Sequence, residues 1–157
     1  MLRMAPLVVV LVVGLLAAVA GQPKPDYSGE WVLNLQRSAL DPRIAAGIEK
    51  GTIAIVHHDP AFELRRTFVR GGKPDSVSFA LTTDGVEKVQ VEGQVTWHMR
   101  MTWEGGALAA RMRGTAPQGE ATNVVFYRLL DGGRTLEARE SFRGPGLEYD
   151  NVWILEK

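Results

Sequence analysis

Hydrophobic and polar residues alternate along most of this chain in short runs that are separated by tight turns. Asp84-Gly85, Asp131-Gly132-Gly133 and Gly144-Pro145-Gly146 each stand between two runs rich in Val, Phe, Trp, Thr, Met and Leu. Alternation with a period of two is typical of strands that bury one face, and turns this short pair each strand with its neighbour in the chain. The pattern therefore predicts an antiparallel up-and-down meander.

Ten candidate strands follow one another, the first over residues 29–35. The others are expected at 52–57, 61–70, 76–82, 86–91, 95–103, 107–113, 121–130, 134–142 and 147–155. Because neighbouring short strands can merge, we expect 8–10 strands in the fold. A meander of this length protects its edges most simply by closing on itself. The fold class expected is all-β, an antiparallel meander closed into a barrel.

One short helical segment is predicted near residues 41–50, between the first two strands. Asp41 can cap its N-terminus, and Pro42 suits the first helical position. Ile44 and Ile48 lie one turn apart, and Gly51 can end the helix. A helix this short can cover one end of a barrel, so we expect it to form a lid.

The first residues have the pattern of an export signal. Arg3 precedes an apolar stretch over residues 7–19, and Ala18-Val19-Ala20 is a small-x-small cleavage site. The stretch is shorter than the roughly 20 residues that span a bilayer, although an uncleaved anchor is the alternative. The domain boundaries expected are 1–20 for a signal peptide, 21–28 for an extended leader and 29–157 for the barrel. The protein is expected to be exported, periplasmic or extracellular, with no integral membrane span after signal removal.

Composition narrows the classes of partner. The 157 residues include 18 Lys and Arg, 18 Asp and Glu, and no Cys. Without a basic excess the chain lacks the electrostatic footprint of a nucleic-acid-binding protein. Without Cys, disulfides and thiol chemistry are excluded, so packing alone must hold the fold. No cofactor is implied, and no protein partner can be named.

Three polar residues interrupt the apolar faces of the predicted strands. Arg66, Glu140 and Asn151 are each flanked, two residues away, by large apolar side chains. A charge on an inward face is costly unless it is paired or hydrogen-bonded. These residues either converge in the lumen and orient the polar end of a ligand, or they satisfy themselves through an internal Arg66–Glu140 pair or turn outward at bulges.

Residues 95–103 place two methionines between two tryptophans on one face of a strand. Methionine adapts its shape and suits cavities for variable apolar molecules. Thioethers also bind Cu(I), but His98 points to the opposite face and no third soft ligand is fixed, so no metal site is predicted. The candidate residues for ligand binding in the lumen are Arg66, Trp97, Met99, Met101, Trp103, Glu140, Asn151 and Trp153.

Catalysis finds little support in the sequence. There is no Cys and no Gly-x-Ser-x-Gly motif. His57 and His58 are adjacent on a strand, so their side chains point to opposite faces and cannot chelate one ion. We interpret both as exposed residues beside a turn. An envelope enzyme that uses Glu140 as acid or base is a minor alternative, and the chain is expected not to be an enzyme.

The segment Gly29-Glu30-Trp31-Val32-Leu33-Asn34, at the start of the meander, resembles the first strand of lipocalin-like (calycin-type) proteins secreted by bacteria. The chain is also similar to an uncharacterised group that begins in this way and ends in a strand like Ile154-Leu155-Glu156-Lys157. The resemblance implies that Gly29 and Trp31 close the base of the barrel. It also implies that an arginine from a late strand, here Arg139 or Arg143, covers the Trp31 ring.

The function expected is noncatalytic binding of a small, largely apolar ligand in the lumen. The alternative is a filled barrel that serves as a structural or interaction protein of the cell envelope. In that case its function would lie in the loops, the longest of which are predicted at 70–76 and 114–120. An open lumen would favour the first reading.

Overall fold

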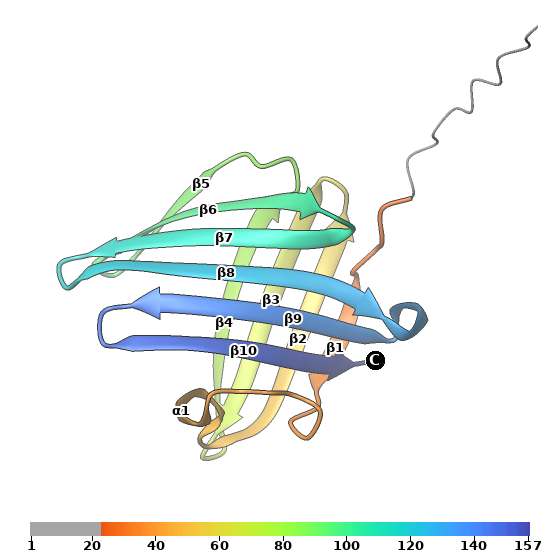
Figure 1. Ribbon diagram of the computed structural model, residues 1–157, viewed down its shortest axis with the longest axis horizontal. Helices are drawn as coiled ribbons and strands as arrows, with labels where there is room; N and C mark the ends of the chain where they lie inside the picture. The colour runs from red at the N-terminus through yellow and green to blue at the C-terminus, as the bar shows by residue number, and fades with distance from the viewer. Residues whose placement is uncertain (1–22) are drawn as a thin grey trace, which may run out of the picture.

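The computed structural model describes residues 23–157, and the predicted signal peptide over 1–20 lies outside the described residues. The described part of the chain folds into ten strands, one short α-helix and a 3-10 turn (Figure 1). The strands are β1 (Gly29–Leu33), β2 (Ile48–His58), β3 (Ala61–Arg70), β4 (Lys73–Thr82), β5 (Lys88–Glu92), β6 (Val95–Glu104), β7 (Ala107–Ala116), β8 (Gly119–Leu130), β9 (Thr135–Gly144) and β10 (Leu147–Glu156). The helix is α1 (Pro42–Ala45), and the turn is η1 (Asp131–Gly133).

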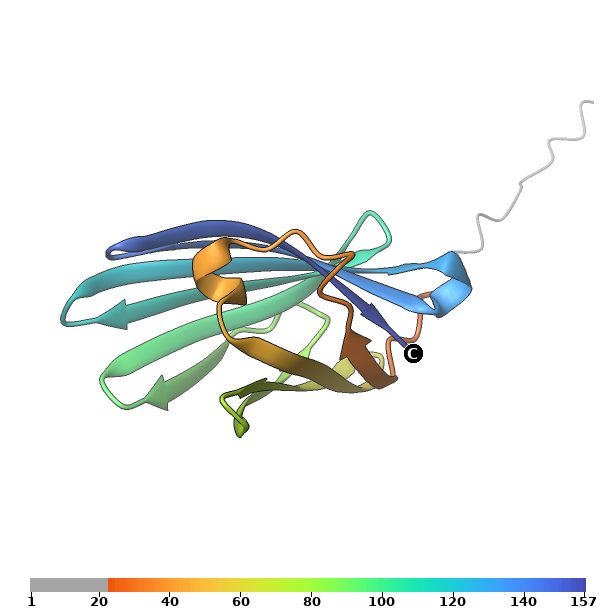
Figure 2. The same ribbon diagram turned by 90° about the horizontal axis from the view of Figure 1, so that it is seen from below.

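All ten strands belong to one antiparallel sheet, in which the first and the last strand of the chain are neighbours. Its order is β4-β3-β2-β1-β10-β9-β8-β7-β6-β5, with β1 paired to β10 through Val32 and Glu156. The strands β2–β4 cross behind β6–β10 at a steep angle, so the sheet folds over itself into two layers (Figures 1 and 2). The predicted all-β antiparallel meander is confirmed, and the barrel that was expected to be closed is nearly closed.

The barrel is not closed between β4 and β5, because these strands are the two edges of the sheet and do not pair with each other. We call the gap between them the seam. Residues 83–87 connect these strands. An isolated bridge between Asp84 and Thr102 ties the connection to β6, and Lys88 Nζ donates a hydrogen bond to the carbonyl oxygen of Ala80 at 3.0 Å. Side chains rather than a backbone ladder therefore span this seam.

The short helical segment is confirmed, but it is a single turn. Asp41 caps α1 as expected. The helix ends at Ala45 because Gly47, with a φ of 72°, reverses the chain, and β2 begins at Ile48. Gly51, the expected helix end, lies inside β2. No helix within residues 23–157 is long and apolar enough to cross a membrane.

The two loops predicted to be the longest are tight turns. Only Gly71 and Gly72 separate β3 from β4, and only Pro117 and Gln118 separate β7 from β8. Both pairs of strands extend further than the sequence pattern indicated. The longest connection between strands in the described chain is 34–47, which contains α1. The expected loop surfaces at 70–76 and 114–120 are therefore not present.

Candidate functional site

A cavity of about 310 Å³ lies inside the barrel and is lined by residues of every strand from β2 to β10. This volume is at the lower end of the range, roughly 300–1,000 Å³, that small-molecule sites occupy. Most of the wall is apolar and includes Ile53, Phe68, Met99, Val125, Phe142 and Leu155. The alternating faces of the strands thus leave a hollow rather than a filled core in this part of the barrel.

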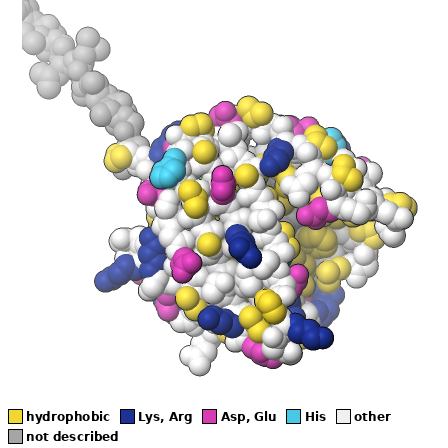
Figure 3. All heavy atoms as spheres, turned by 180° about the vertical axis from the view of Figure 1, so that it is seen from behind, with side chains coloured by type: hydrophobic (Ala, Val, Ile, Leu, Met, Phe, Trp, Pro, Cys, Tyr) yellow, Lys and Arg dark blue, Asp and Glu magenta, His cyan; other side chains and the backbone are white. Residues whose placement is uncertain are grey.

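The cavity reaches the surface at the seam between the two edge strands. Val77 and Ser78 of β4 and Gln90 and Glu92 of β5 belong to its lining, and Val77 and Glu92 are exposed. Figure 3 shows the surface hollowed at the side of the molecule away from the grey terminal trace, with hydrophobic side chains inside the hollow. A small molecule therefore has a route between solvent and the cavity.

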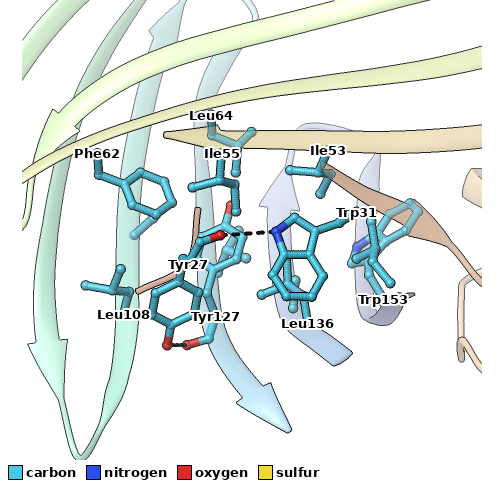
Figure 4. Packing of buried hydrophobic residues seen from close by; sticks show 14 of the residues in the cluster. Tyr27, Trp31, Ile53, Ile55, Phe62, Leu64, Leu108, Tyr127, Leu136 and Trp153 are labelled. Carbon is cyan, nitrogen blue, oxygen red and sulfur yellow. Dashed lines mark hydrogen bonds between the residues drawn. The ribbon is translucent and has the colours of Figure 1, made fainter. Parts of the chain in front are cut away.

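Away from this hollow the barrel is filled by a set of fully buried side chains that we call the base cluster. It consists of Tyr27, Trp31, Phe62, Met101, Leu108 and Leu136, and Figure 4 labels all of these except Met101. Tyr27 lies in the predicted leader, yet its hydroxyl donates to the carbonyl oxygen of Tyr127 at 2.8 Å. Trp31 Nε1 donates to the carbonyl oxygen of Tyr27 at 3.1 Å. The segment before β1 is therefore part of the core.

Gly29 and Trp31 of the Gly-x-Trp motif lie at this base, but the cation over the Trp31 ring is not the expected arginine. Lys157 Nζ lies 4.4 Å from the centroid of the Trp31 ring. Gly29 makes room for it, because a Cβ at Gly29, whose φ is 140°, would lie 2.8 Å from Lys157 Cε. Arg139 and Arg143 instead pair with carboxylates on β9 and β10. A lysine thus takes the place that the resemblance assigned to an arginine.

Glu140 organises a polar cluster on the cavity wall. Its Oε2 accepts a hydrogen bond from Trp153 Nε1 at 2.8 Å, and its Oε1 accepts one from Asn123 Nδ2 at 3.0 Å. The Tyr149 hydroxyl lies 3.5 Å from Oε1. Burial raises the pKa of Tyr149 to about 12, and the charge of Glu140 adds to this rise, so the phenol keeps its proton. All four side chains line the cavity.

Arg66 lines the same cavity without a carboxylate partner. Its guanidinium lies 4.7 Å from the centroid of the Phe68 ring. Within residues 23–157 it forms no ion pair, whereas Arg37, Arg43, Arg100, Arg111, Arg139 and Arg143 all do. It lines the same cavity as the polar cluster, and its positive charge partly offsets the rise in the pKa of Tyr149. The internal Arg66–Glu140 pair considered from the sequence is not formed.

The predicted lumen candidates separate into two groups. Those that line the cavity are Arg66, Trp97, Met99, Glu140 and Trp153. Met101 instead belongs to the base cluster, and Trp103 Nε1 donates to Asp59 Oδ1 at 2.9 Å outside the cavity. Asn151 Oδ1 accepts from the backbone N–H of Asp41 at 2.7 Å and so fastens the start of α1 to β10. Met101, Trp103 and Asn151 thus have structural partners, and a role in binding for the first group stays a prediction.

The sequence led us to interpret His57 and His58 as exposed. In the structure His58 is exposed, but His57 is buried. His57 Nδ1 accepts a hydrogen bond from the backbone N–H of Tyr27 at 3.3 Å, which places the ring proton on Nε2. Burial lowers the pKa of His57, and the carboxylates of Asp26 and Asp59 oppose this only in part. The neutral ring therefore fastens the segment before β1 to β2.

We expect the free energy of unfolding to decrease as the pH falls below 6.5, the ordinary pKa of histidine. The folded-state pKa of His57 lies below that of the unfolded chain, so the unfolded chain takes up the proton first. Stability is complete above 6.5 and is lost through the window below it, by up to about 1.4 kcal/mol per pH unit. Urea denaturation of the wild type and of His57→Gln at a series of pH values measures this slope.

His58→Gln is the matched control for this pH series, because His58 is exposed on the other face of the same strand. It should keep the wild-type slope, whereas His57→Gln should flatten it. A wild-type stability that does not change through this window would show that the buried ring does not contribute in this way.

Comparison with protein-family models gives no match, and no curated protein sequence matches the chain. Solved structures do match its fold. The brain fatty-acid-binding protein of Drosophila melanogaster aligns with a TM-score of 0.54 and 13% identity, covering 84% of this chain and 100% of that one. Secretory abundant heat soluble protein 4 of Ramazzottius varieornatus aligns with a TM-score of 0.56 and 14% identity, covering 87% and 99%.

Lipid binding protein 8 of Caenorhabditis elegans aligns with a TM-score of 0.54 and 11% identity, covering 83% of this chain and 95% of that one. Identities this low show similarity of fold alone. The fold similarity agrees with the calycin-type resemblance of the sequence. The chain has the same type of lipocalin-like β-barrel fold as these proteins.

Proposed function

We propose that this protein is an exported, noncatalytic carrier that binds a small, largely apolar molecule with one acidic group inside the barrel. The observation that carries the proposal is the hollow of about 310 Å³ with Arg66 on its wall and no ion-pair partner for Arg66 in the described chain. A partly buried charge is stabilised by an opposite charge. An acidic ligand would bring that charge, while its apolar part would cover the hydrophobic wall.

The fold comparisons support an apolar ligand without identifying it. Two of the matching structures are described as a fatty-acid-binding protein and a lipid binding protein. The same fold also serves secretory abundant heat soluble proteins, so the fold alone does not decide function. The argument for this chain therefore rests on its own cavity.

The size of the cavity limits the ligand. If each non-hydrogen atom of a ligand occupies about 30 Å³, which is the volume of one water molecule in the liquid, the cavity holds roughly ten such atoms. Because the cavity opens at the seam between β4 and β5, a somewhat longer chain can extend toward solvent. A medium-chain acid such as decanoic acid is therefore a suitable probe.

Decanoic acid is expected to bind saturably and to change the fluorescence of Trp97 and Trp153, which line the cavity. Arg66→Met should weaken this binding about 10- to 100-fold, because hydrogen bonds to a charged group are worth about 1.5–3 kcal/mol and about 1.4 kcal/mol corresponds to tenfold. Methyl decanoate, which has no charge, should bind the wild type and the variant equally. Fluorescence titration and calorimetry measure these affinities.

Arg65→Met is the matched control for this titration, because Arg65 precedes Arg66 on β3 and is exposed on its other face. It should bind decanoic acid as the wild type does. If no apolar acid binds, or if Arg66→Met leaves the affinity unchanged, the proposed role of this cavity is wrong.

Export is the second half of the proposal and rests on the signal-peptide pattern over residues 1–20. The expected result is a mature chain that begins at Gly21. Mass spectrometry of the protein recovered from a bacterial host, separately from cytoplasm, periplasm and medium, measures the start of the chain. A full-length chain confined to the cytoplasm would contradict export while leaving the binding proposal intact.

A further inference from the structure

The cavity wall carries two charges of opposite sign that do not pair with each other. The charged residues of the lining are Arg66, Glu92 and Glu140. Glu92 is exposed to solvent, whereas Arg66 is partly buried and Glu140 is only 7% exposed. Neither Arg66 nor Glu140 forms an ion pair within residues 23–157. Each of these two charges is therefore left without an opposite charge by the described chain.

Arg66 and Glu140 belong to different layers of the barrel. Arg66 lies on β3 and Glu140 lies on β9. The strands β2–β4 cross behind β6–β10, so the cavity has its positive charge on one layer and its buried negative charge on the other (Figures 1 and 2). A molecule in the cavity therefore lies between an arginine and a carboxylate.

The hydrogen bonds of Glu140 come from neutral groups. Trp153 Nε1 donates to Oε2 at 2.8 Å, and an indole N–H can only donate. Asn123 donates to Oε1 at 3.0 Å, and the Tyr149 hydroxyl lies at the long distance of 3.5 Å. Two oxygens offer about four acceptor positions, so acceptor capacity remains. Neutral donors do not bring the positive charge that best stabilises a buried carboxylate.

Aromatic side chains surround Glu140 on the cavity wall. Phe142 follows two residues later on the same face of β9, and Tyr149 and Trp153 flank the residue of β10 that pairs with Glu140. The Phe142 and Tyr149 rings are stacked, with their centroids 5.2 Å apart. Aromatic rings attract cations, and a carboxylate beside them adds to this attraction. This part of the wall therefore favours an ammonium group over a neutral donor.

We propose that the ligand is a zwitterion, an apolar amino acid whose carboxylate pairs with Arg66 and whose ammonium group pairs with Glu140. This inference rests on the proposed carrier function and names the chemical class of its ligand. Both charges belong at the same end of the molecule, because Arg66 and Glu140 line one small cavity. The hydrocarbon chain then covers the apolar wall. A simple acid would leave Glu140 without a cation.

The test compares two ligands of nearly equal shape, 2-aminodecanoic acid and 2-hydroxydecanoic acid, near neutral pH. The first is a zwitterion, and the second has a neutral hydroxyl group in place of the ammonium group. At least one enantiomer of the amino acid should bind the wild type about tenfold more tightly than either enantiomer of the hydroxy acid. Calorimetric titration gives each dissociation constant.

Glu140→Gln removes the negative charge and keeps the shape of the side chain. It should abolish the preference for the amino acid, and it should bind decanoic acid more tightly than the wild type does, because a charge that repels the ligand carboxylate is gone. General damage to the cavity would weaken both ligands, so these opposite changes identify the ion pair. Glu148→Gln, the same change at an exposed position of β10, is the matched control and should keep the preference.

The possible failures are distinguishable. If decanoic acid binds through Arg66 but neither enantiomer of the amino acid is preferred to the hydroxy acid, the zwitterion inference is overturned and the carrier proposal stands. A preference that survives in Glu140→Gln also overturns the inference. The comparison of amino acid and hydroxy acid uses the wild type alone, so it remains decisive if this variant does not fold. If none of the acids binds, both the inference and the carrier proposal are overturned.

Discussion

Replacing Trp31 by alanine is expected to lower the free energy of unfolding by about 3–5 kcal/mol. Trp31 is fully buried at the centre of the base cluster, so its removal leaves a void that the surrounding strands fill only in part. It also removes the donor to the carbonyl oxygen of Tyr27. Small domains have total stabilities of about 5–15 kcal/mol, so a large part of the stability would be lost. Urea denaturation followed by far-ultraviolet circular dichroism measures the change.

Two further variants separate the contributions at this position. Trp31→Phe keeps an aromatic ring and should cost clearly less than alanine. Lys157→Met keeps the aliphatic chain over Gly29 but removes the charge above the ring, and should cost least. A smaller loss for Trp31→Ala than for Lys157→Met would contradict the central role of the indole.

Replacing Ala138 by phenylalanine is expected to abolish ligand binding while the protein remains folded. Ala138 lines the cavity between Tyr127 on β8 and Trp153 on β10, its paired neighbours in the sheet. A small residue between two large rings keeps the space open, and a phenyl ring at this position would fill it. Because the ring enters a hollow, the stability change should stay below about 2 kcal/mol, within the range for enlarged core residues. Titration with decanoic acid and urea denaturation test both parts.

Thr122→Phe is the control for bulk, because it adds the same ring at an exposed position of β8. It should bind decanoic acid like the wild type. Saturable binding by Ala138→Phe with unchanged affinity would show that the ligand occupies another part of the molecule.

The strands with one apolar and one polar face could be oriented from the sequence. Phe62, Leu64 and Phe68 of β3 are buried as their spacing indicates, and this spacing also brings Arg66 to the cavity. Glu140 reaches the cavity by the same rule on β9. A period of two is a property of the strand itself, so it needs no knowledge of the partner strands.

Asn123 was missed because β8 is apolar on both faces. Val124, Val125 and Phe126 are consecutive apolar residues, so there is no alternation that shows which face of the strand Asn123 lies on. In the structure Val125 is buried, while Val124 and Phe126 are half-buried. The inward position of Asn123 follows only once the pairing with β9 sets the register opposite Phe142.

Contacts between distant segments were the other source of error. The burial of Tyr27 and His57 depends on the segment before β1 crossing the base of the barrel. The position of Lys157 over Trp31 depends on the pairing of β1 with β10. The local alternation of polar and apolar residues does not show either of these long-range contacts. The Gly-x-Trp motif predicted that a cation covers the Trp31 ring, but it did not predict that this cation is a lysine.

The unzipped seam between β4 and β5 has a consequence for how these molecules behave toward one another. Strand edges offer backbone donors and acceptors to other chains and are starting points for fibrils. Here β5 is only five residues long and begins with Lys88, whose ammonium group occupies the carbonyl of Ala80 on the opposite edge. Pro74 removes a backbone donor from β4. Both features hinder the pairing of these edges with the strands of another chain, on the side of the barrel where the cavity opens.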